Sequence, residues 1–226
     1  MVIIRICLFL FIDILLILLL SPIGFYQLLT KPQTYISNKN KQKKIVVLIH
    51  GTGVRDWQWS VAKMWLYLSD ISYTSINYDC SRPIVESCNT IVNQLNYYNS
   101  FKIYLIGHSQ GGLIARYIHT KIKAQRSFLL NAPQKGAVIL NWLYPSEQLY
   151  PCSKNDMRYG STFINLLPND IIPDRIYEIA GINDFVRYDH CLHYYKNVYT
   201  SWFGHYFSAV NPYLWFNYII KIIKRD

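Results

Sequence analysis

The chain has 226 residues, of which 51% are hydrophobic and 16% charged, and its formal net charge is +10. This length is sufficient for one domain with a full core, and the apolar content excludes a disordered chain. Half of the net charge, +5, lies within residues 1–44, and the remainder is scattered along the chain. That distribution argues against a nucleic-acid-binding surface, which gathers its basic residues on the folded domain.

The N-terminal segment is apolar from Ile6 to Leu20 except for Asp13. We predict that residues 1–24 form a hydrophobic helix that acts as a signal anchor or as a secretory signal peptide. The run is long and no A-x-A cleavage site follows it, which favours the anchor. Residues 25–43 are predicted to form a polar, basic tether, and residues 44–226 to form the folded domain.

Two sequence features disagree about the side of the membrane on which this domain lies. The basic cluster Lys39–Lys44 would be cytoplasmic by the positive-inside rule, but it lies about 20 residues beyond the apolar run, at the limit of that rule. The even number of cysteines beyond the apolar run suits disulfides in an oxidising compartment, although four buried free thiols are the alternative. These are Cys80, Cys88, Cys152 and Cys191. We expect an extracytoplasmic domain, periplasmic or, if the N-terminal segment is cleaved, secreted.

The domain alternates strand and helix patterns. Short apolar runs predict buried strands at residues 44–49, 73–78, 102–106, 127–130, 175–180 and 196–201. Apolar residues at helical spacing predict helices at 57–69, 83–98 and 112–122, and an amphipathic helix after the cap Asn211-Pro212. This order predicts an α/β domain with a mostly parallel sheet flanked by helices, and active sites of such sheets lie at the carboxyl ends of the strands.

A G-x-S-x-G motif lies between the strand at 102–106 and the helix at 112–122. The turn must be sharp, so small residues are needed two positions on either side of the serine, where Gly107 and Gly111 stand. Ser109 would then lie at a helix N-terminus, where free N–H groups favour developing negative charge. We predict that Ser109 is a nucleophile and that the neighbouring His108 packs rather than reacts.

In this context the chain resembles the lipases and esterases of the α/β-hydrolase superfamily, especially compact bacterial lipases, over residues 45–220. The resemblance rests on the order of four further segments, which are His50–Gly53, Asn131–Ala137, Tyr159–Ile164 and Ala180–Val186. It implies the α/β-hydrolase fold, with an oxyanion hole formed by the backbone N–H groups of Gln110 and Thr52. His50 lies upstream of the nucleophile, out of the family order, so we expect a structural role for it.

The resemblance implies that an acid and then a histidine follow the serine. Asp184 comes after the strand at 175–180 and is our candidate for the acid. Asp189 is its rival, and Asp170 and Asp174 precede that strand.

The base should follow a further strand. His190 and His193 lie too close to Asp184 for a strand to intervene. His205 follows the run at 196–201 and is our candidate.

These residues imply a serine hydrolase that cleaves carboxylic esters through an acyl-enzyme. The apolar side chains of residues 137–172 favour a lipid ester, either an acylglycerol or a phospholipid, although short-chain esters, amides and thioesters stay open. These side chains are Trp142, Leu143, Tyr144, Leu149, Tyr150, Phe163, Leu166 and Leu167. The alternative of a different class is a membrane-tethered, non-catalytic binding protein with a hydrolase fold. No metal or nucleotide motif is present, so we expect no cofactor and no metal.

Overall fold

The computed structural model describes residues 34–39, 41–137, 140, 152–168, 173–181, 184, 197–201 and 204–226, together with residues 11, 14, 15, 18 and 19. The hydrophobic helix predicted for residues 1–24 therefore lies largely outside the described residues. Among the residues that are described, no helix has both the length and the apolar character needed to cross a bilayer.

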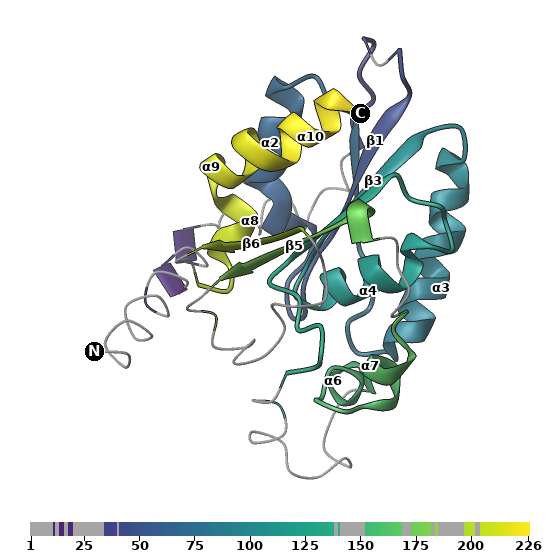
Figure 1. Ribbon diagram of the computed structural model, residues 1–226, viewed down its shortest axis with the longest axis vertical. Helices are drawn as coiled ribbons and strands as arrows, with labels where there is room; N and C mark the ends of the chain where they lie inside the picture. The colour runs from purple at the N-terminus through teal and green to yellow at the C-terminus, as the bar shows by residue number, and fades with distance from the viewer. Residues whose placement is uncertain are drawn as a thin grey trace.

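The six predicted strands are all present and form one sheet (Figure 1). They are β1 (Lys44–Ile49), β2 (Tyr73–Ile76), β3 (Lys102–His108), β4 (Arg126–Leu130), β5 (Ile176–Gly181) and β6 (Asn197–Ser201). Their order is β2-β1-β3-β4-β5-β6, and each of the five neighbouring pairs is parallel. The chain runs outward from β1 to β2 and then returns to β3 on the other side of β1. The carboxyl ends of β1 and β3 thus flank a topological switch point, where such sheets bind ligands.

Helices cover both faces of the sheet. One face packs against α3 (Ile84–Leu95), its 3₁₀ extension η2 (Asn96–Tyr98) and α4 (Gln110–His119), and the other packs against η1 (Asp56–Trp59) and α2 (Ser60–Leu68). The C-terminal elements α8 (Phe207–Val210), α9 (Pro212–Leu214), the π-helical η5 (Trp215–Ile219) and α10 (Ile220–Arg225) lie beside α2 (Figure 1). In the sequence, three short elements follow β4 and precede β5: α6 (Cys152–Asp156), α7 (Thr162–Leu166) and η4 (Pro173–Arg175). The predicted helices are confirmed, whereas α6, α7 and α8 were not predicted.

The central strand β1 is apolar after its first residue because both of its faces are buried. Ile45, Val47 and Ile49 of β1 point into the core under α3 and α4, while Val46 and Leu48 point into the core under α2 and the C-terminal helix. All five of these side chains are completely buried. This two-sided burial explains why β1 reads as a continuous apolar run and does not alternate with polar residues.

The C-terminal helix has the predicted cap and the predicted amphipathic character. The side chain of Asn211 accepts hydrogen bonds from the backbone N–H groups of Tyr213 and Leu214, and Pro212 occupies the first helical position. Trp215 is completely buried and stands edge-on to Trp59 of η1, with 6.3 Å between ring centroids. The charged residues of α10 lie on the opposite, exposed face.

The described part of the predicted tether is attached to the domain. Tyr35 exchanges two backbone hydrogen bonds with Tyr73 of β2, each 2.9 Å long. The hydroxyl groups of Ser37 and Tyr35 both donate to one carboxylate oxygen of Asp70, at 2.6 and 3.0 Å. The packed fold therefore begins by Thr34, ten residues before β1.

Two of the four cysteines that suggested disulfides are free thiols. Cys80 is half-buried, and Cys88 of α3 is completely buried, which raises its thiol pKa to about 12. The expectation of two disulfides is therefore wrong for these residues, and the alternative of free thiols holds for them. This finding removes part of the argument for an oxidising compartment.

A buried ion pair joins η1 to α2. The Lys63 ammonium lies 2.5 Å from both carboxylate oxygens of Asp56, and only 3% of the Lys63 side chain and 7% of the Asp56 side chain are exposed. The backbone N–H of Asp56 donates to the Asn77 side chain, which follows β2. Asp56 thus attaches the segment after β1 to α2 through Lys63 and to the segment after β2 through Asn77.

We predict that Lys63→Met destabilises the protein by about 3–5 kcal/mol, because the Asp56 carboxylate is left buried without its counter-ion. The double variant with Asp56→Leu removes both charges and should recover much of this loss. Urea unfolding measures both variants. As a control, Arg82→Ala breaks an exposed pair with Glu86 and should cost less than about 1 kcal/mol. A Lys63→Met protein that unfolds at the wild-type urea concentration would contradict the prediction.

Candidate active site

The predicted nucleophile lies in a sharp turn between β3 and α4. Ser109 has φ 53° and ψ −120°, a backbone conformation that non-glycine residues rarely adopt. A Cβ atom on Gly107 would lie 2.1 Å from the carbonyl oxygen of Gly111, and one on Gly111 would lie 2.2 Å from that of Ile49. Both glycines of the G-x-S-x-G motif are therefore required sterically, as the sequence predicts.

The turn places Ser109 between the ends of three strands. Its backbone N–H donates to the carbonyl oxygen of Leu130, the last residue of β4, at 2.9 Å. Gly51, which follows β1, lies so close that a Cβ atom there would be 3.2 Å from the Cβ atom of Ser109. Ser109 is 7% exposed. It thus lies at the switch point of the sheet, where the order of the strands predicts a ligand site.

The structure brings together the two residues predicted to form an oxyanion hole. Thr52 follows Gly51 in the segment after β1, and Gln110 is the first residue of α4. The Thr52 hydroxyl donates a hydrogen bond to the side-chain oxygen of Gln110. The first N–H groups of a helix have no partner within it, so the N-terminus of α4 presents donors beside Thr52.

Asp184 and His205 meet although they are 21 residues apart in the sequence. His205 Nδ1 lies 2.8 Å from Asp184 Oδ2, and the two residues are only 4% and 5% exposed. Asp184 lies beyond the end of β5, and His205 beyond the end of β6. Since a carboxylate only accepts hydrogen bonds, Nδ1 donates to it, which leaves Nε2 for another partner.

The rival residues are placed differently. Asp174 lies in η4, directly before β5, at the end of the strand opposite to Asp184. Asp170, Asp189, His190 and His193 lie outside the described residues.

His50 has the structural role expected of it. Its Nδ1 donates to the carbonyl oxygen of Gly51 at 2.8 Å, its Nε2 accepts from the backbone N–H of Tyr78, and its ring stacks on that of Tyr78. Burial lowers the His50 pKa to about 4, so the ring is neutral at pH 7. His50 thereby holds the segment after β1 against the segment after β2.

Asn131 makes hydrogen bonds to the loop that carries His205, a role that the sequence analysis did not predict. It follows β4 in a left-handed conformation, with φ 48°, and is completely buried. Its Nδ2 donates to the carbonyl oxygens of His205 and Gly204, at 2.7 and 3.0 Å, while its Oδ1 accepts from the N–H of Gly181 at 2.6 Å. Asn131 therefore joins the end of β5 to the loop that carries His205. Two signals were available for it: its position directly after a buried strand and its place in one of the segments that carry the resemblance.

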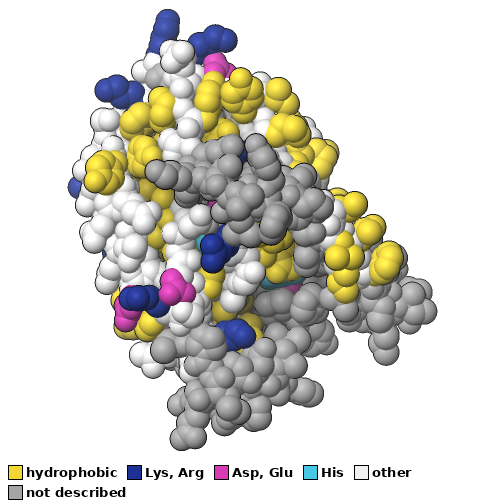
Figure 2. Space-filling model, turned by 180° about the vertical axis from the view of Figure 1, so that it is seen from behind, with side chains coloured by type: hydrophobic (Ala, Val, Ile, Leu, Met, Phe, Trp, Pro, Cys, Tyr) yellow, Lys and Arg dark blue, Asp and Glu magenta, His cyan; other side chains and the backbone are white. Residues whose placement is uncertain are grey.

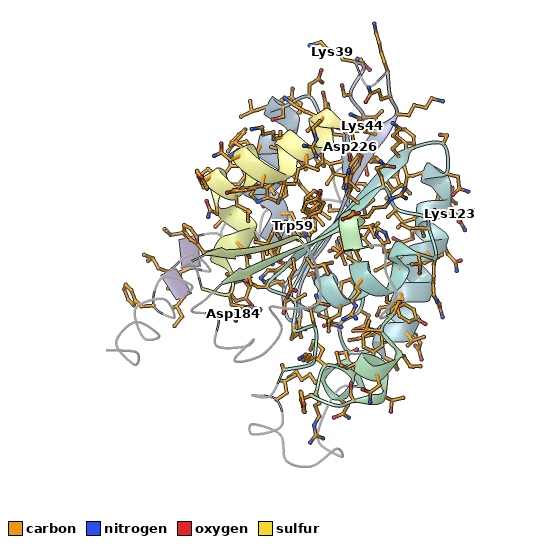
Figure 3. All side chains as sticks on the ribbon, viewed as in Figure 1. Lys39, Lys44, Trp59, Lys123, Asp184 and Asp226 are labelled. Atoms are coloured by element: carbon orange, nitrogen blue, oxygen red, sulfur yellow. The ribbon has the colours of Figure 1, made fainter. Side chains whose placement is uncertain are left out.

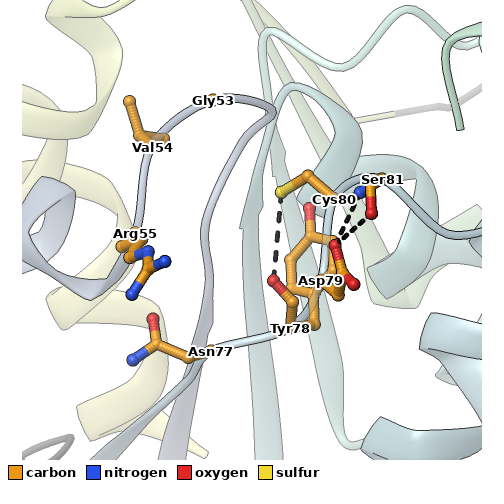
Figure 4. A pocket seen from close by; sticks show the side chains of 8 residues that line it. All are labelled: Gly53, Val54, Arg55, Asn77, Tyr78, Asp79, Cys80 and Ser81. Atoms are coloured by element: carbon orange, nitrogen blue, oxygen red, sulfur yellow. Dashed lines mark hydrogen bonds between the residues drawn. The ribbon is translucent and has the colours of Figure 1, made fainter. Parts of the chain in front are cut away.

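A pocket of about 570 Å³ adjoins this site (Figure 4). It lies between residues 53–55, which follow β1, and residues 77–81, which follow β2. The Asp79 carboxylate is engaged within its own turn, where the N–H and hydroxyl of Ser81 donate to it at 2.9 and 2.6 Å. The side chains of Arg55 and Asn77 also line the pocket. The pocket, which begins at the residue after Thr52, is therefore lined by one cation, one engaged carboxylate and several neutral polar groups.

The apolar side chains expected over the nucleophile are only partly described. Phe163 and Leu167 are each 2% exposed and belong to the core under α3 and α4, so they do not line an acyl site. Leu166 is 59% exposed. The other five residues of that group lie outside the described residues. Within the described segments, no cluster of three or more His, Cys, Asp or Glu side chains could hold a metal ion.

Comparison with solved structures finds the same architecture in several hydrolases. A carboxylesterase of the thaumarchaeon Nitrososphaera gargenis is 13% identical, with 87% of this chain and 95% of that chain covered and a TM-score of 0.65. The mature form of a Bacillus licheniformis lipase is 15% identical, with 85% and 98% covered and a TM-score of 0.63.

An epoxide hydrolase from Vigna radiata is also similar, at 11% identity, 87% and 98% coverage and a TM-score of 0.58. No protein-family model matches the sequence, and no curated protein matches it significantly. The structural similarity is therefore a similarity of fold. This protein has the α/β-hydrolase fold that its sequence predicts.

Proposed function

We propose that the protein is a serine hydrolase of carboxylic esters, with Ser109, His205 and Asp184 as its catalytic triad. The observation that carries the proposal is the 2.8 Å hydrogen bond between Asp184 and His205, at the same end of the sheet as the Ser109 turn. The fold alone does not select a reaction, since esterases, a lipase and an epoxide hydrolase share it. The serine in the strained turn favours acyl transfer.

In this mechanism the Ser109 hydroxyl attacks the ester carbonyl while His205 Nε2 removes its proton. Asp184 accepts the Nδ1 hydrogen bond, which fixes the tautomer and stabilises the imidazolium. The backbone N–H groups of Gln110 and Thr52 bind the oxyanion. His205 then protonates the departing alcohol, which leaves an acyl-enzyme on Ser109. In the second half of the reaction His205 deprotonates a water molecule, which attacks the acyl group, and then returns the proton to Ser109 as the acid leaves.

We predict that a fluorophosphonate probe labels the wild-type protein and that Ser109→Ala abolishes labelling and ester hydrolysis. Asp184→Asn should reduce kcat about 10⁴-fold, because the amide favours the wrong tautomer of His205. Asp174→Asn is the matched control, since that carboxylate lies at the opposite end of β5 and should leave activity unchanged. A wild-type protein that no probe labels would support the alternative, a non-catalytic binding protein.

The substrate class that we propose is a lipid ester, an acylglycerol or a phospholipid. The apolar sequence of residues 137–172 supports an acyl chain, and the polar pocket beside Thr52 supports a polar head. Arg55 is the cation of that pocket, and within the described residues no acid is paired with it. Its guanidinium suits a phosphate or another anionic group.

A panel of p-nitrophenyl esters of increasing chain length, run beside phospholipid vesicles, tests this class. We expect turnover to rise with chain length and phospholipid to be hydrolysed. Arg55→Gln should weaken hydrolysis of anionic phospholipid without affecting neutral esters. Arg82→Gln is its control, since Arg82 already pairs with Asp79 and Glu86. Turnover restricted to the shortest esters would exclude a lipid substrate.

We also propose that residues 1–24 attach the domain to a membrane and that the domain is extracytoplasmic. Lys and Arg side chains gather at the upper end of the surface in Figure 2, and Figure 3 places Lys39 and Lys44 at the end of the sheet opposite to Asp184. A pocket there is lined by Lys39, Lys41, Lys44 and Lys224 with Asp70 as the one acid of its lining. A basic surface of this kind suits anionic lipid headgroups.

The neighbouring face of α2 adds exposed apolar side chains to this surface. Met64 is 51% exposed and Leu68 is 70% exposed, and Phe216 of the adjoining helix is 43% exposed. Phe216 packs on Trp65 of α2, with 5.8 Å between ring centroids, so the two helices form one surface. Apolar and basic groups together favour contact with a membrane interface.

We predict that the full chain floats with anionic phospholipid vesicles and stays bound in high salt, since an inserted helix resists screening. Release by salt would indicate attachment through the basic surface alone. Protein that remains free of vesicles would contradict attachment. In spheroplasts, whose cytoplasmic membrane is intact, added protease should digest the domain if it is extracytoplasmic. Protection from the protease would place the domain in the cytoplasm.

A further inference from the structure

His108 stands next to the proposed nucleophile, yet the mechanism above gives it no role. It is completely buried, and both of its ring nitrogens have partners. Nδ1 lies 2.6 Å from the side-chain nitrogen of Gln58, and Nε2 lies 2.8 Å from the carbonyl oxygen of His205. Gln58 belongs to η1, in the segment that follows β1. The ring therefore stands between two separate loops of the site.

Chemistry fixes the direction of every hydrogen bond in this chain of groups. The backbone N–H of Gly51 donates to Gln58 Oε1 at 3.0 Å, which identifies the oxygen of that amide. The amide nitrogen of Gln58 must then donate, so Nδ1 of His108 accepts. Since the carbonyl oxygen of His205 only accepts, Nε2 of His108 carries the proton. One neutral tautomer of His108 satisfies all the bonds.

The surroundings of His108 keep this ring neutral. Burial is the main cause that lowers its pKa well below the ordinary value, and the charge of a protonated His205 adds to it. The ring centroids of His108 and His205 are 4.8 Å apart, and Tyr206 packs on His108 at 5.3 Å. A second proton on His108 would, in addition, face the donating amide of Gln58.

We propose that Gln58 and His108 are positioning residues. They connect the loop after β1, at Gly51, to the backbone of the catalytic His205. The inference rests on the proposed function and deepens it. The loop that holds Thr52 and the loop that holds the base follow β1 and β6, two strands that are not neighbours in the sheet. The hydrogen-bonded chain from Gly51 to His205 spans that separation. Its loss would shift the base relative to the oxyanion hole, and a misplacement of about 1 Å can reduce a rate a hundredfold.

The tautomer of His108 can be tested without any measurement of activity. In wild-type protein with ¹⁵N-labelled histidine, we expect the His108 ring to carry its proton on Nε2 and to remain neutral through the pH range in which an ordinary histidine titrates. A ring that titrates within this range, or that carries its proton on Nδ1, would overturn the inference. This measurement gives its answer even if Ser109 proves unreactive, in which case only the proposed function fails.

Kinetics test the consequence. His108→Leu removes both bonds and should lower kcat for a p-nitrophenyl ester at least tenfold with little change in KM. His108→Gln retains a donor near the position of Nε2 and should restore part of kcat. His119→Leu is the matched control, because His119 is another buried histidine but lies at the C-terminal end of α4, the end away from Ser109, where it bonds to Ser127 of β4. It should lower the melting temperature without lowering kcat.

Two outcomes would contradict the positioning role. The first is wild-type kcat in folded His108→Leu. The second is an equal loss of kcat in His119→Leu, which would point to general destabilisation.

Gln58→Glu gives a further readout, since it keeps the acceptor for Gly51 but replaces the donor that faces His108. The ring then needs a second proton to keep both bonds, so the pH profile of kcat should gain an ionisation. An unchanged profile would sink the proposed link through Gln58.

Discussion

Helix α4 begins against the backbone of β1, so close that no side chain fits between them. The carbonyl oxygen of Ile49 lies where a Cβ atom of Gly111 would stand, and the backbone of Gly111 lies where a Cβ atom of Gly107 would stand. This contact forces the turn at Ser109 into a left-handed conformation and directs the N-terminus of α4 toward the segment after β1. The arrangement of the proposed site is consistent with this approach, because it places Gly51 against Ser109 and Thr52 against Gln110.

Most of the fold could be predicted because its determinants are local. The central strand β1 is buried on both faces, so it reads as an apolar run, and the sharp turn at Ser109 imposes glycine at fixed spacing. The pairing of Asp184 with His205 was predicted from the order serine, acid, histidine that the resemblance implies, and it fits a parallel sheet, which brings the residues after successive strands to one edge. The cap at Asn211 was readable for the same reason, because a cap depends only on the next few residues.

The remaining features depend on contacts between distant parts of the chain. Gln58 and His108 are 50 residues apart, and Asn131 and His205 are 74 apart, so no periodicity connects them. Phe163 and Leu167 were expected near an acyl chain but fill the core, because apolar character does not distinguish a core position from a pocket. The even number of cysteines suggested disulfides, whereas the packing of α3 buries Cys88 as a small apolar side chain.

The segment between Gly51 and Trp59 shows how polar contacts achieve what apolar packing does not. Apolar burial is non-directional, so it stabilises a loop without fixing the direction of its N–H groups. Here Gly51 is bonded to Gln58 within the segment, and Asp56 is bonded to both Lys63 and Asn77. The bonds of Gly51 to Gln58 and of Asp56 to Lys63 are buried and therefore costly to break, since an unpaired partner would remain out of water, while the bond to Asn77 is part-buried. The segment is held at both ends by groups of fixed geometry, which is what a preorganised oxyanion hole requires, because its donors must be in place before the charge develops.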